Sequence, residues 1–181
     1  MSGVYNKLLD LKNSGFNPEN ILDIGANVGE FTNMCKIIWP DCNFYLIEAN
    51  RNCEKYLSKI SDNVYIEVLG EFDDKPIEFY MTTDNDICTG NSTYLEKTKH
   101  YSGDNLIIEK RITKKLDSLF SINFDLIKID TQGSELDILK GSSRNCEYTK
   151  YIIIETSLKE YNQDAPLENK IIDYMCNIGY N

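Results

Sequence analysis

The chain has 181 residues, 41% of them hydrophobic, which is enough for one compact domain with a core of its own. Its formal net charge of −10 argues against a protein that binds nucleic acid or an anionic membrane surface, because both need basic patches. No apolar run is long enough to cross a bilayer, and the N-terminus lacks the apolar core of a signal peptide. The six cysteines form no C-x-x-C pair and there is a single histidine, so we expect a cytoplasmic protein with reduced thiols and no zinc site.

The first part of the chain alternates between apolar strands and amphipathic helices. Gly15 and Pro18 end the first helix. The predicted elements are a helix at 4–13, a strand at 21–24, a helix at 31–39, a strand at 43–48, a helix at 52–60 and a strand at 64–69. This order predicts parallel strands joined by right-handed crossovers.

The middle of the chain departs from this alternation. Two segments, 77–81 and 106–112, are predicted strands, and between them lies the polar segment 82–103, rich in Asn, Thr, Asp and Gly. A polar connection of this length inside a compact domain is typical of a lid or binding loop, or of a disordered segment. We expect residues 82–103 to form a lid that orders over a ligand.

The alternation resumes toward the C-terminus. The predicted elements are a helical turn at 116–120, a strand at 124–129, a helix at 134–140, a strand at 151–154 and a helix at 167–177. Because no repeats or low-complexity linkers interrupt it, residues 1–181 are interpreted as a single domain. We predict an α/β, Rossmann-like fold with helices on both faces of a central, mostly parallel sheet, whose strands take the order 3-2-1-4-5.

Residues 21–29, with the sequence ILDIGANVG, carry the clearest functional pattern. A buried strand passes into a helix through a turn with Gly25 and Gly29, and Gly25 is expected to let a ligand lie against the main chain. Asn27 stands at the middle glycine position of the dinucleotide fingerprint, and Asp23 precedes the turn. This spacing favours a cofactor with a charged amino-acid tail, such as S-adenosylmethionine, over a nicotinamide dinucleotide. A strand, turn and helix without any ligand is the third interpretation.

Acidic residues follow several of the predicted strands. In an open parallel sheet, ligands bind outside the carboxyl ends of the strands. Glu48 ends the second strand, where a carboxylate can accept both hydroxyls of a ribose, and Gly70 after the third strand is expected to flank an adenine. Asp130 ends the fourth strand. It could orient a sulfonium, position a substrate hydroxyl or hold a metal, and the residues alone leave these three roles open.

His100 is the only histidine of the chain and lies in the polar segment. A histidine there could act as the general base for an acceptor hydroxyl. The alternative is an exposed loop residue without a role in the chemistry.

Five segments of the chain together form a recognisable pattern. They are residues 21–29, the strand end at Glu48, Asn91-Ser92-Thr93, residues 114–119 and, above all, KIDTQGSELDILKG at 128–141. Together they resemble the FkbM-type S-adenosylmethionine-dependent methyltransferases over residues 18–180. The resemblance implies a class I Rossmann-like methyltransferase fold and O-methylation of a hydroxyl on a sugar or another small metabolite. It implies S-adenosylmethionine as the cofactor and a small hydroxyl acceptor, carbohydrates included, as the partner.

The resemblance also implies roles for individual residues. Asp23, Gly25, Asn27 and Gly29 would line the methionine end of the cofactor, Glu48 would bind ribose, Asn91 and Ser92 would lie near the cofactor tail or the substrate, and Asp130 and Gln132 would face the reactive centre. Asp130 and His100 are the candidate catalytic residues. No nucleic-acid or membrane partner is expected.

The chain departs from the family at its C-terminal end. A class I domain normally adds two more strands after the last helix, and this sequence stops at Asn181. Residues 151–155 would then form an edge strand, which invites pairing with another chain. We therefore expect either a fragment of a longer protein or a homo-oligomer that covers this edge. A degenerate domain that binds without turnover is the alternative function, and a nicotinamide-dependent oxidoreductase is the less favoured one.

Overall fold

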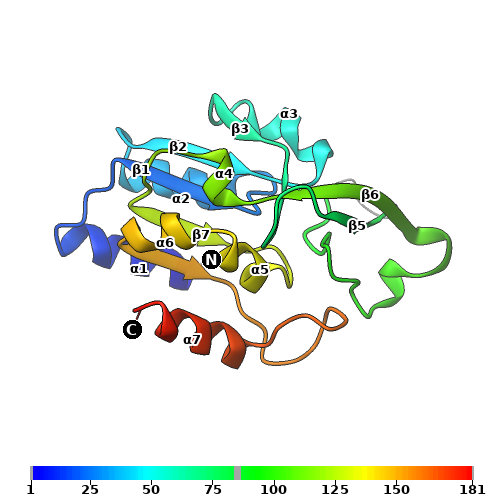
Figure 1. Ribbon diagram of the computed structural model, residues 1–181. Helices are drawn as coiled ribbons and strands as arrows, with labels where there is room; N and C mark the ends of the chain where they lie inside the picture. Colours follow the sequence, from blue (N-terminus) through cyan, green and yellow to red (C-terminus); the bar gives the residue numbers. More distant parts are fainter. Residues whose placement is uncertain (1, 84–86, 181) are drawn as a thin grey trace.

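The computed structural model describes residues 2–83 and 87–180, and its centre is a five-stranded sheet (Figure 1). Its strands are β1 (Asn20–Ile24), β2 (Asn43–Ile47), β3 (Asn63–Tyr65), β7 (Leu126–Ile129) and β8 (Tyr151–Ile154). They lie in the order β3-β2-β1-β7-β8, and every neighbouring pair is parallel. The sequence predicted this order and this type of sheet. The carboxyl ends of β1, β2 and β7 therefore meet at one edge.

Helices cover both faces of the sheet. One face carries α1 (Ser2–Asn13), α2 (Glu30–Ile38) and α3 (Glu54–Leu57), and the other carries α4 (Leu116–Leu119), α5 (Glu135–Lys140), α6 (Ser143–Tyr148) and α7 (Glu168–Asn177). Side chains of β1 alternate between the two cores: Ile21 packs in the first, whereas Leu22 and Ile24 pack in the second. The fold is thus the α/β sandwich expected from the sequence. None of the helices within the described residues is long and apolar enough to cross a membrane.

A second, smaller sheet stands beside the carboxyl edge of the first (Figure 1). It has the order β4-β6-β5 and consists of β4 (Val68–Leu69), β5 (Pro76–Thr82) and β6 (Leu106–Lys114). β5 and β6 form an antiparallel pair, and β4 runs parallel to β6. The two strands predicted on either side of the polar segment therefore pair with each other, and they hold residues 87–103 near the edge where the main strands end.

The strand predicted at 64–69 is divided in the structure. β3 remains in the main sheet, whereas Val68 and Leu69 leave it and pair with Thr113 and Lys114 of β6. The local pattern carries no signal for this change of partner, because both parts of the run are apolar enough for a strand. The division turns β4 toward the cavity described below.

Helix α6 is absent from the sequence-based prediction. Its sequence, SRNCEY, is polar and lacks an apolar period of helical spacing. The carboxylate of Asp117 accepts the backbone N–H groups of Arg144 and Asn145 at 2.9 and 3.0 Å and so satisfies the first turn. Because Asp117 belongs to α4, no pattern within the segment itself indicates the helix.

β8 is the last strand of the main sheet, as the sequence predicted. Within residues 2–83 and 87–180, no strand pairs with its outer edge, and in Figure 1 the red helix α7 lies beyond the orange strand. Ile171 of α7 packs in the same core as Ile152 and Ile154 of β8. The helix therefore protects apolar side chains of this strand, while the backbone groups along its outer edge have no neighbouring strand in the described chain.

Candidate active site

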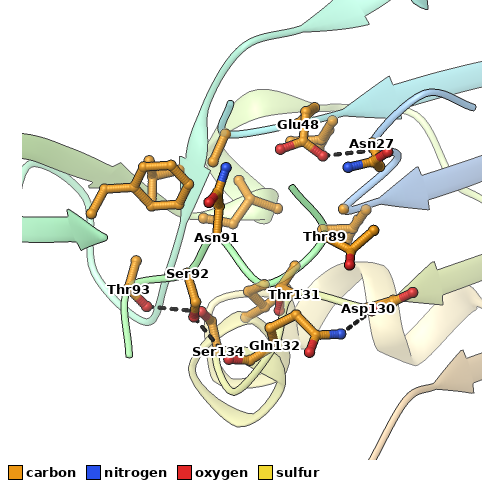
Figure 2. A pocket seen from close by; sticks show the side chains of 18 of the residues that line it. Asn27, Glu48, Thr89, Asn91, Ser92, Thr93, Asp130, Thr131, Gln132 and Ser134 are labelled. Carbon is orange, nitrogen blue, oxygen red and sulfur yellow. Dashed lines mark hydrogen bonds between the residues drawn. The ribbon is translucent and has the colours of Figure 1, made fainter. Parts of the chain in front are cut away.

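Two neighbouring cavities open at the carboxyl edge of the main sheet. The first cavity has a volume of about 310 Å³ and lies among the ends of β1, β2 and β7, the start of α5 and the polar segment (Figure 2). The second cavity, of about 470 Å³, lies between α2 and the ends of β7 and β8. Both volumes are typical of small-molecule sites. The residues that line both cavities, here called the junction, are Gly25, Asn27, Thr89, Asp130 and Glu155.

Gly25 begins the turn after β1. Its φ of +71° is a left-handed conformation that favours glycine. A Cβ atom at this position would lie 1.8 Å from the carbonyl oxygen of Asp130, far inside van der Waals contact. Glycine is therefore required because the turn lies directly against the end of β7. The sequence predicted that this space belongs to a ligand, whereas the structure fills it with the main chain of Asp130.

The rest of the turn carries Asn27 and Gly29. Asn27 has a φ of +49°, and its side-chain Nδ2 donates to the carbonyl oxygen of Ile87 at 3.1 Å. Gly29 precedes α2 with a φ of +83°, and a Cβ atom there would lie 2.3 Å from Cδ1 of Ile60. Gly29 lines neither cavity, so its role is structural: it lets α2 begin close to the side chain of Ile60. Asn27, in contrast, belongs to the junction.

Asp23 and Lys128 form a buried ion pair beneath the turn. Asp23 is 1% exposed, accepts the hydroxyl of Thr32 at 2.7 Å and lies 3.3 Å from Lys128 Nζ. Lys128 Nζ also donates to the carbonyl oxygen of Gly25 at 2.8 Å and lies 3.4 Å from Asp130. Burial alone would lower the pKa of Lys128, but the negative charges of Asp23 and Asp130 have the larger effect together, and the pKa is raised. Asp23 lines neither cavity, so it acts on the site through Lys128 and the turn.

Glu48 directly follows β2 and lines the first cavity. Its carboxylate accepts the backbone N–H groups of Asn27 at 2.7 Å and Asn50 at 2.8 Å. Burial raises the pKa of Glu48, although these hydrogen bonds oppose the change. Each carboxylate oxygen keeps a further lone pair, so Glu48 can accept hydrogen bonds from two hydroxyl groups in the cavity.

The polar segment closes one side of the first cavity, where Asn91 and Ser92 line it. Ser92 Oγ donates to the carbonyl oxygen of Gln132 at 2.8 Å, and Ser92 also forms an antiparallel bridge with Tyr80 of β5. The segment is therefore fastened both to the turn between β7 and α5 and to the smaller sheet. Residues 84–86 of the predicted lid lie outside the described residues.

Asp130 and Glu155 line both cavities, and Gln132, which lines the first cavity, contacts both of them. Gln132 Nε2 donates to Asp130 Oδ1 at 3.0 Å, as Figure 2 shows, and to Glu155 Oε2 at 2.9 Å. Burial alone would raise the pKa of Asp130, but hydrogen bonding with Glu155 and the charge of Lys128 lower it. The hydrogen bond with Asp130, together with burial, raises the pKa of Glu155 to about 7. The pKa of Glu155 is thus raised while that of Asp130 is lowered, although the side chain of Glu155 is exposed to solvent.

Glu155 is the acidic residue of this site that the sequence pattern did not identify, and Thr89 and Lys128 were not identified either. Glu155 directly follows β8, just as Glu48 directly follows β2 and Asp130 directly follows β7. An apolar strand that ends in an acid is therefore the common signal of all three residues, and it could have identified Glu155 as well.

The second cavity has a mainly apolar wall. Its apolar side chains belong to α1, α2, the turn before α2 and the ends of β7 and β8; they are Val4, Ala26, Val28, Phe31, Met34, Ile129, Ile153 and Ile154. Charged groups enter the wall at Glu30 and Lys128 and at the two carboxyl groups of the junction. A ligand in this cavity would contact hydrocarbon on most sides and carboxyl groups at one end.

Besides Asp23 and Gly29, two further residues predicted for the site, Gly70 and His100, lie outside both cavities. Gly70 is buried and donates its N–H to β6, and the preceding Val68 and Leu69 line the first cavity instead. His100 is exposed on a 3₁₀ helix (Lys99–Tyr101) and lines neither cavity. The geometry therefore supports neither a catalytic His100 nor an adenine contact by Gly70. In the described part of the chain, no cluster of three or more His, Cys, Asp or Glu side chains could hold a metal ion.

Solved structures that share the fold include two methyltransferases. The methyltransferase FkbM from Methylobacillus flagellatus KT aligns with a TM-score of 0.50 and 18% identity, over 76% of this chain and 32% of that chain. The precorrin-6y C5,15-methyltransferase from Geobacter metallireducens GS-15 aligns with a TM-score of 0.52 and 14% identity, over 99% of this chain and 70% of that chain. This chain thus spans less than half the length of the Methylobacillus protein. At these identities the similarity establishes a Rossmann-like methyltransferase fold and nothing finer.

No curated protein matches the sequence significantly. The family model for the methyltransferase FkbM domain matches residues 23–181. The match begins at the buried aspartate of β1, so it includes the glycine turn, Glu48 and every residue of the junction. By this match, the chain belongs to the FkbM methyltransferase family.

Proposed function

We propose that the protein transfers a methyl group from S-adenosylmethionine to a hydroxyl group of a small molecule. The observation that carries this proposal is the pair of neighbouring cavities that share five lining residues. One cavity holds Glu48 at the end of β2, and both reach the carboxyl groups of Asp130 and Glu155 at their junction. Membership of the FkbM family implies S-adenosylmethionine as the methyl donor.

The residues of the first cavity suit S-adenosylmethionine. Glu48 can accept both ribose hydroxyls. Leu69, Phe79 and Ile138 offer apolar surface to an adenine ring, and Asn91 offers an amide to polar groups of the ligand. When bound, S-adenosylmethionine supplies an electrophilic methyl group on a positively charged sulfur.

The second cavity suits the acceptor. Its mainly apolar wall favours a molecule with a hydrocarbon face, and the carboxyl groups of the junction favour hydroxyl groups. A sugar has both features, because one face of its ring carries C–H groups. Carbohydrates are therefore the first class of acceptor to test. The protein would accelerate the transfer chiefly by aligning the acceptor oxygen with the methyl group and by excluding water.

Calorimetric titration with S-adenosylhomocysteine tests the donor site, with NADH as the competing ligand. Binding of S-adenosylhomocysteine and not of NADH is expected, and the reverse result would favour an oxidoreductase. Radiolabelled methyl transfer from S-adenosylmethionine to a panel of monosaccharides and other small alcohols tests the acceptor site. Tight binding of the donor without transfer to any member of the panel would favour a domain that binds without turnover.

A further inference from the structure

Three carboxylates follow strands of the main sheet and line the cavities, and their hydrogen bonds differ. Glu48 has one backbone N–H group on each oxygen. Asp130 is hydrogen-bonded by Gln132 and lies 3.4 Å from the ammonium of Lys128, which stabilises its charged form. One carboxylate oxygen of Glu155 accepts a hydrogen bond from Gln132, and the hydrogen bond with nearby Asp130, together with the negative charge of that carboxylate, raises the pKa of Glu155. Of the three, Glu155 is therefore the one whose surroundings favour uptake of a proton.

We propose that Glu155 accepts the proton of the acceptor hydroxyl during methyl transfer. The inference rests on the proposed function and adds to it the residue that acts as the base. Glu155 lines both cavities, so it can reach a hydroxyl that enters from the second cavity toward a methyl group in the first. Gln132 is a positioning residue, because its single amide nitrogen fixes the carboxyl groups of Glu155 and Asp130 together.

The transfer balances with these groups. The hydroxyl oxygen forms a bond to the methyl carbon, the bond between that carbon and sulfur breaks, and its electron pair stays on sulfur. The hydroxyl proton passes to Glu155 and afterwards to water. Asp130 keeps its negative charge throughout and so raises the affinity of Glu155 for the proton.

The charged groups around Glu155 come from three elements. Lys128 belongs to β7 and Asp130 directly follows it, Glu135 begins α5, and Glu30 of α2 lines the second cavity. The hydrogen bond with Asp130, burial and the charge of Glu135 raise the pKa of Glu155, Lys128 lowers it, and the result is about 7. A base whose pKa lies close to the working pH combines a useful ionised fraction with useful basicity.

Two analogues of the donor test the position of Glu155 without any acceptor. S-adenosylhomocysteine lacks the methyl group, and sinefungin has an amine-bearing carbon in place of the methylsulfonium. With a pKa raised to about 7, Glu155 carries its proton in part of the molecules at pH 7, so the ammonium of sinefungin should displace a fraction of a proton on binding. Calorimetry in buffers of different ionisation enthalpy measures this release. S-adenosylhomocysteine carries no such charge and should release none.

Glu155→Gln removes the charge and keeps the shape of the side chain. It should abolish the proton release and weaken sinefungin binding at pH 8 by about tenfold, while S-adenosylhomocysteine affinity changes by less than about twofold. Glu160→Gln is the matched control, because Glu160 is exposed, pairs with Lys97 and lines neither cavity. The control should bind both analogues as the wild type does. Circular dichroism confirms that both variants are folded.

The outcomes separate this inference from the proposed function. If wild type binds both analogues but sinefungin releases no proton, or if Glu155→Gln leaves sinefungin affinity unchanged, the inference about Glu155 is overturned. If neither analogue binds to the wild type, the donor site itself is wrong and the proposed function fails with the inference. With an acceptor found in the panel, Glu155→Gln should lower kcat about 10²- to 10⁴-fold with little change in KM for the donor.

Discussion

Glu48→Ala removes a carboxylate that serves the first cavity and the turn after β1 together. In the structure its oxygens accept the backbone N–H groups of Asn27 and Asn50. In the complex with the donor they would also accept the ribose hydroxyls. The substitution should therefore lower both the free energy of unfolding and the affinity for the donor, and these two losses can be measured separately.

The magnitudes follow from the kind of hydrogen bonds that are lost. Hydrogen bonds to a charged group contribute about 1.5–3 kcal/mol, so the affinity for S-adenosylhomocysteine should fall roughly 13- to 160-fold. A buried N–H group without an acceptor costs about 1–3 kcal/mol. Asn27 lines the cavity, so water can reach its N–H group, whereas Asn50 is buried. The free energy of unfolding should therefore fall by about 2–4 kcal/mol, from about 1 kcal/mol for the N–H group of Asn27 and about 1–3 kcal/mol for that of Asn50.

Calorimetric titration with S-adenosylhomocysteine measures the affinity, and urea unfolding measures the stability. Glu54→Ala is the control, because it removes an equal charge from an exposed position on α3 and should change neither quantity appreciably. An unchanged affinity in a Glu48→Ala protein that has lost stability would refute the reasoning. Glu48 would then support the turn only, and the ribose would bind elsewhere.

Further predictions concern the turn, the junction, the polar segment and the sheet edge. Gly25→Ala should lower the free energy of unfolding by about 2–5 kcal/mol, because the new Cβ would meet the main chain at the end of β7. Gly103→Ala is the control: Gly103 has a φ of +57° but open space around it, so the loss should be only about 1–2 kcal/mol. Equal losses in urea unfolding would contradict the packing argument. The contribution of Glu155 to the free energy of unfolding should fall as the pH rises from 4.5 to 7. The Glu155 carboxyl keeps its proton up to about pH 7 in the folded protein but loses it near pH 4.5 in the unfolded chain. Urea unfolding across that range should therefore show a steeper decline for the wild type than for Glu155→Gln, and parallel curves would exclude the raised pKa. Residues 87–103 should exchange amide hydrogens more slowly with S-adenosylhomocysteine bound, and unchanged exchange would mark a passive wall. Light scattering should report a homo-oligomer, as expected if a second copy covers the outer edge of β8, and a monomer would contradict this expectation.

The main sheet was predictable because its signals are local. Each buried strand is a short apolar run followed by a turn and a helix, and the β-α-β order leaves few ways to arrange such strands. The division of 64–69 was not predictable, since Val68 and Leu69 change partners through contacts with β6, a strand that lies far along the chain. Helix α6 likewise depends on a carboxylate from α4, Asp117, and not on its own residues.

The candidate site was predictable where an acidic residue directly follows an apolar strand, because the ends of parallel strands meet at the ligand-binding edge of the sheet. Glu48 and Asp130 stand where the pattern placed them, and both line the first cavity. Whether a residue near the cavity faces it depends on packing. Asp23 is turned inward to Lys128, and Gly70 is buried in the pairing with β6. Residues 88, 89 and 91–93 of the polar segment line the first cavity, whereas His100 is exposed to solvent.

Lys128 is shared by Asp23 and Asp130, so one cation stands between two carboxylates, while Glu48 adds a further negative charge nearby. The methyl donor brings a positive sulfur into these surroundings, and the thioether that remains after transfer has lost that charge. We therefore expect a site with an excess of carboxylates to bind the thioether product less tightly than the methyl donor. We expect weak product inhibition at low ionic strength, and we expect this selectivity to shrink as added salt screens the carboxylates.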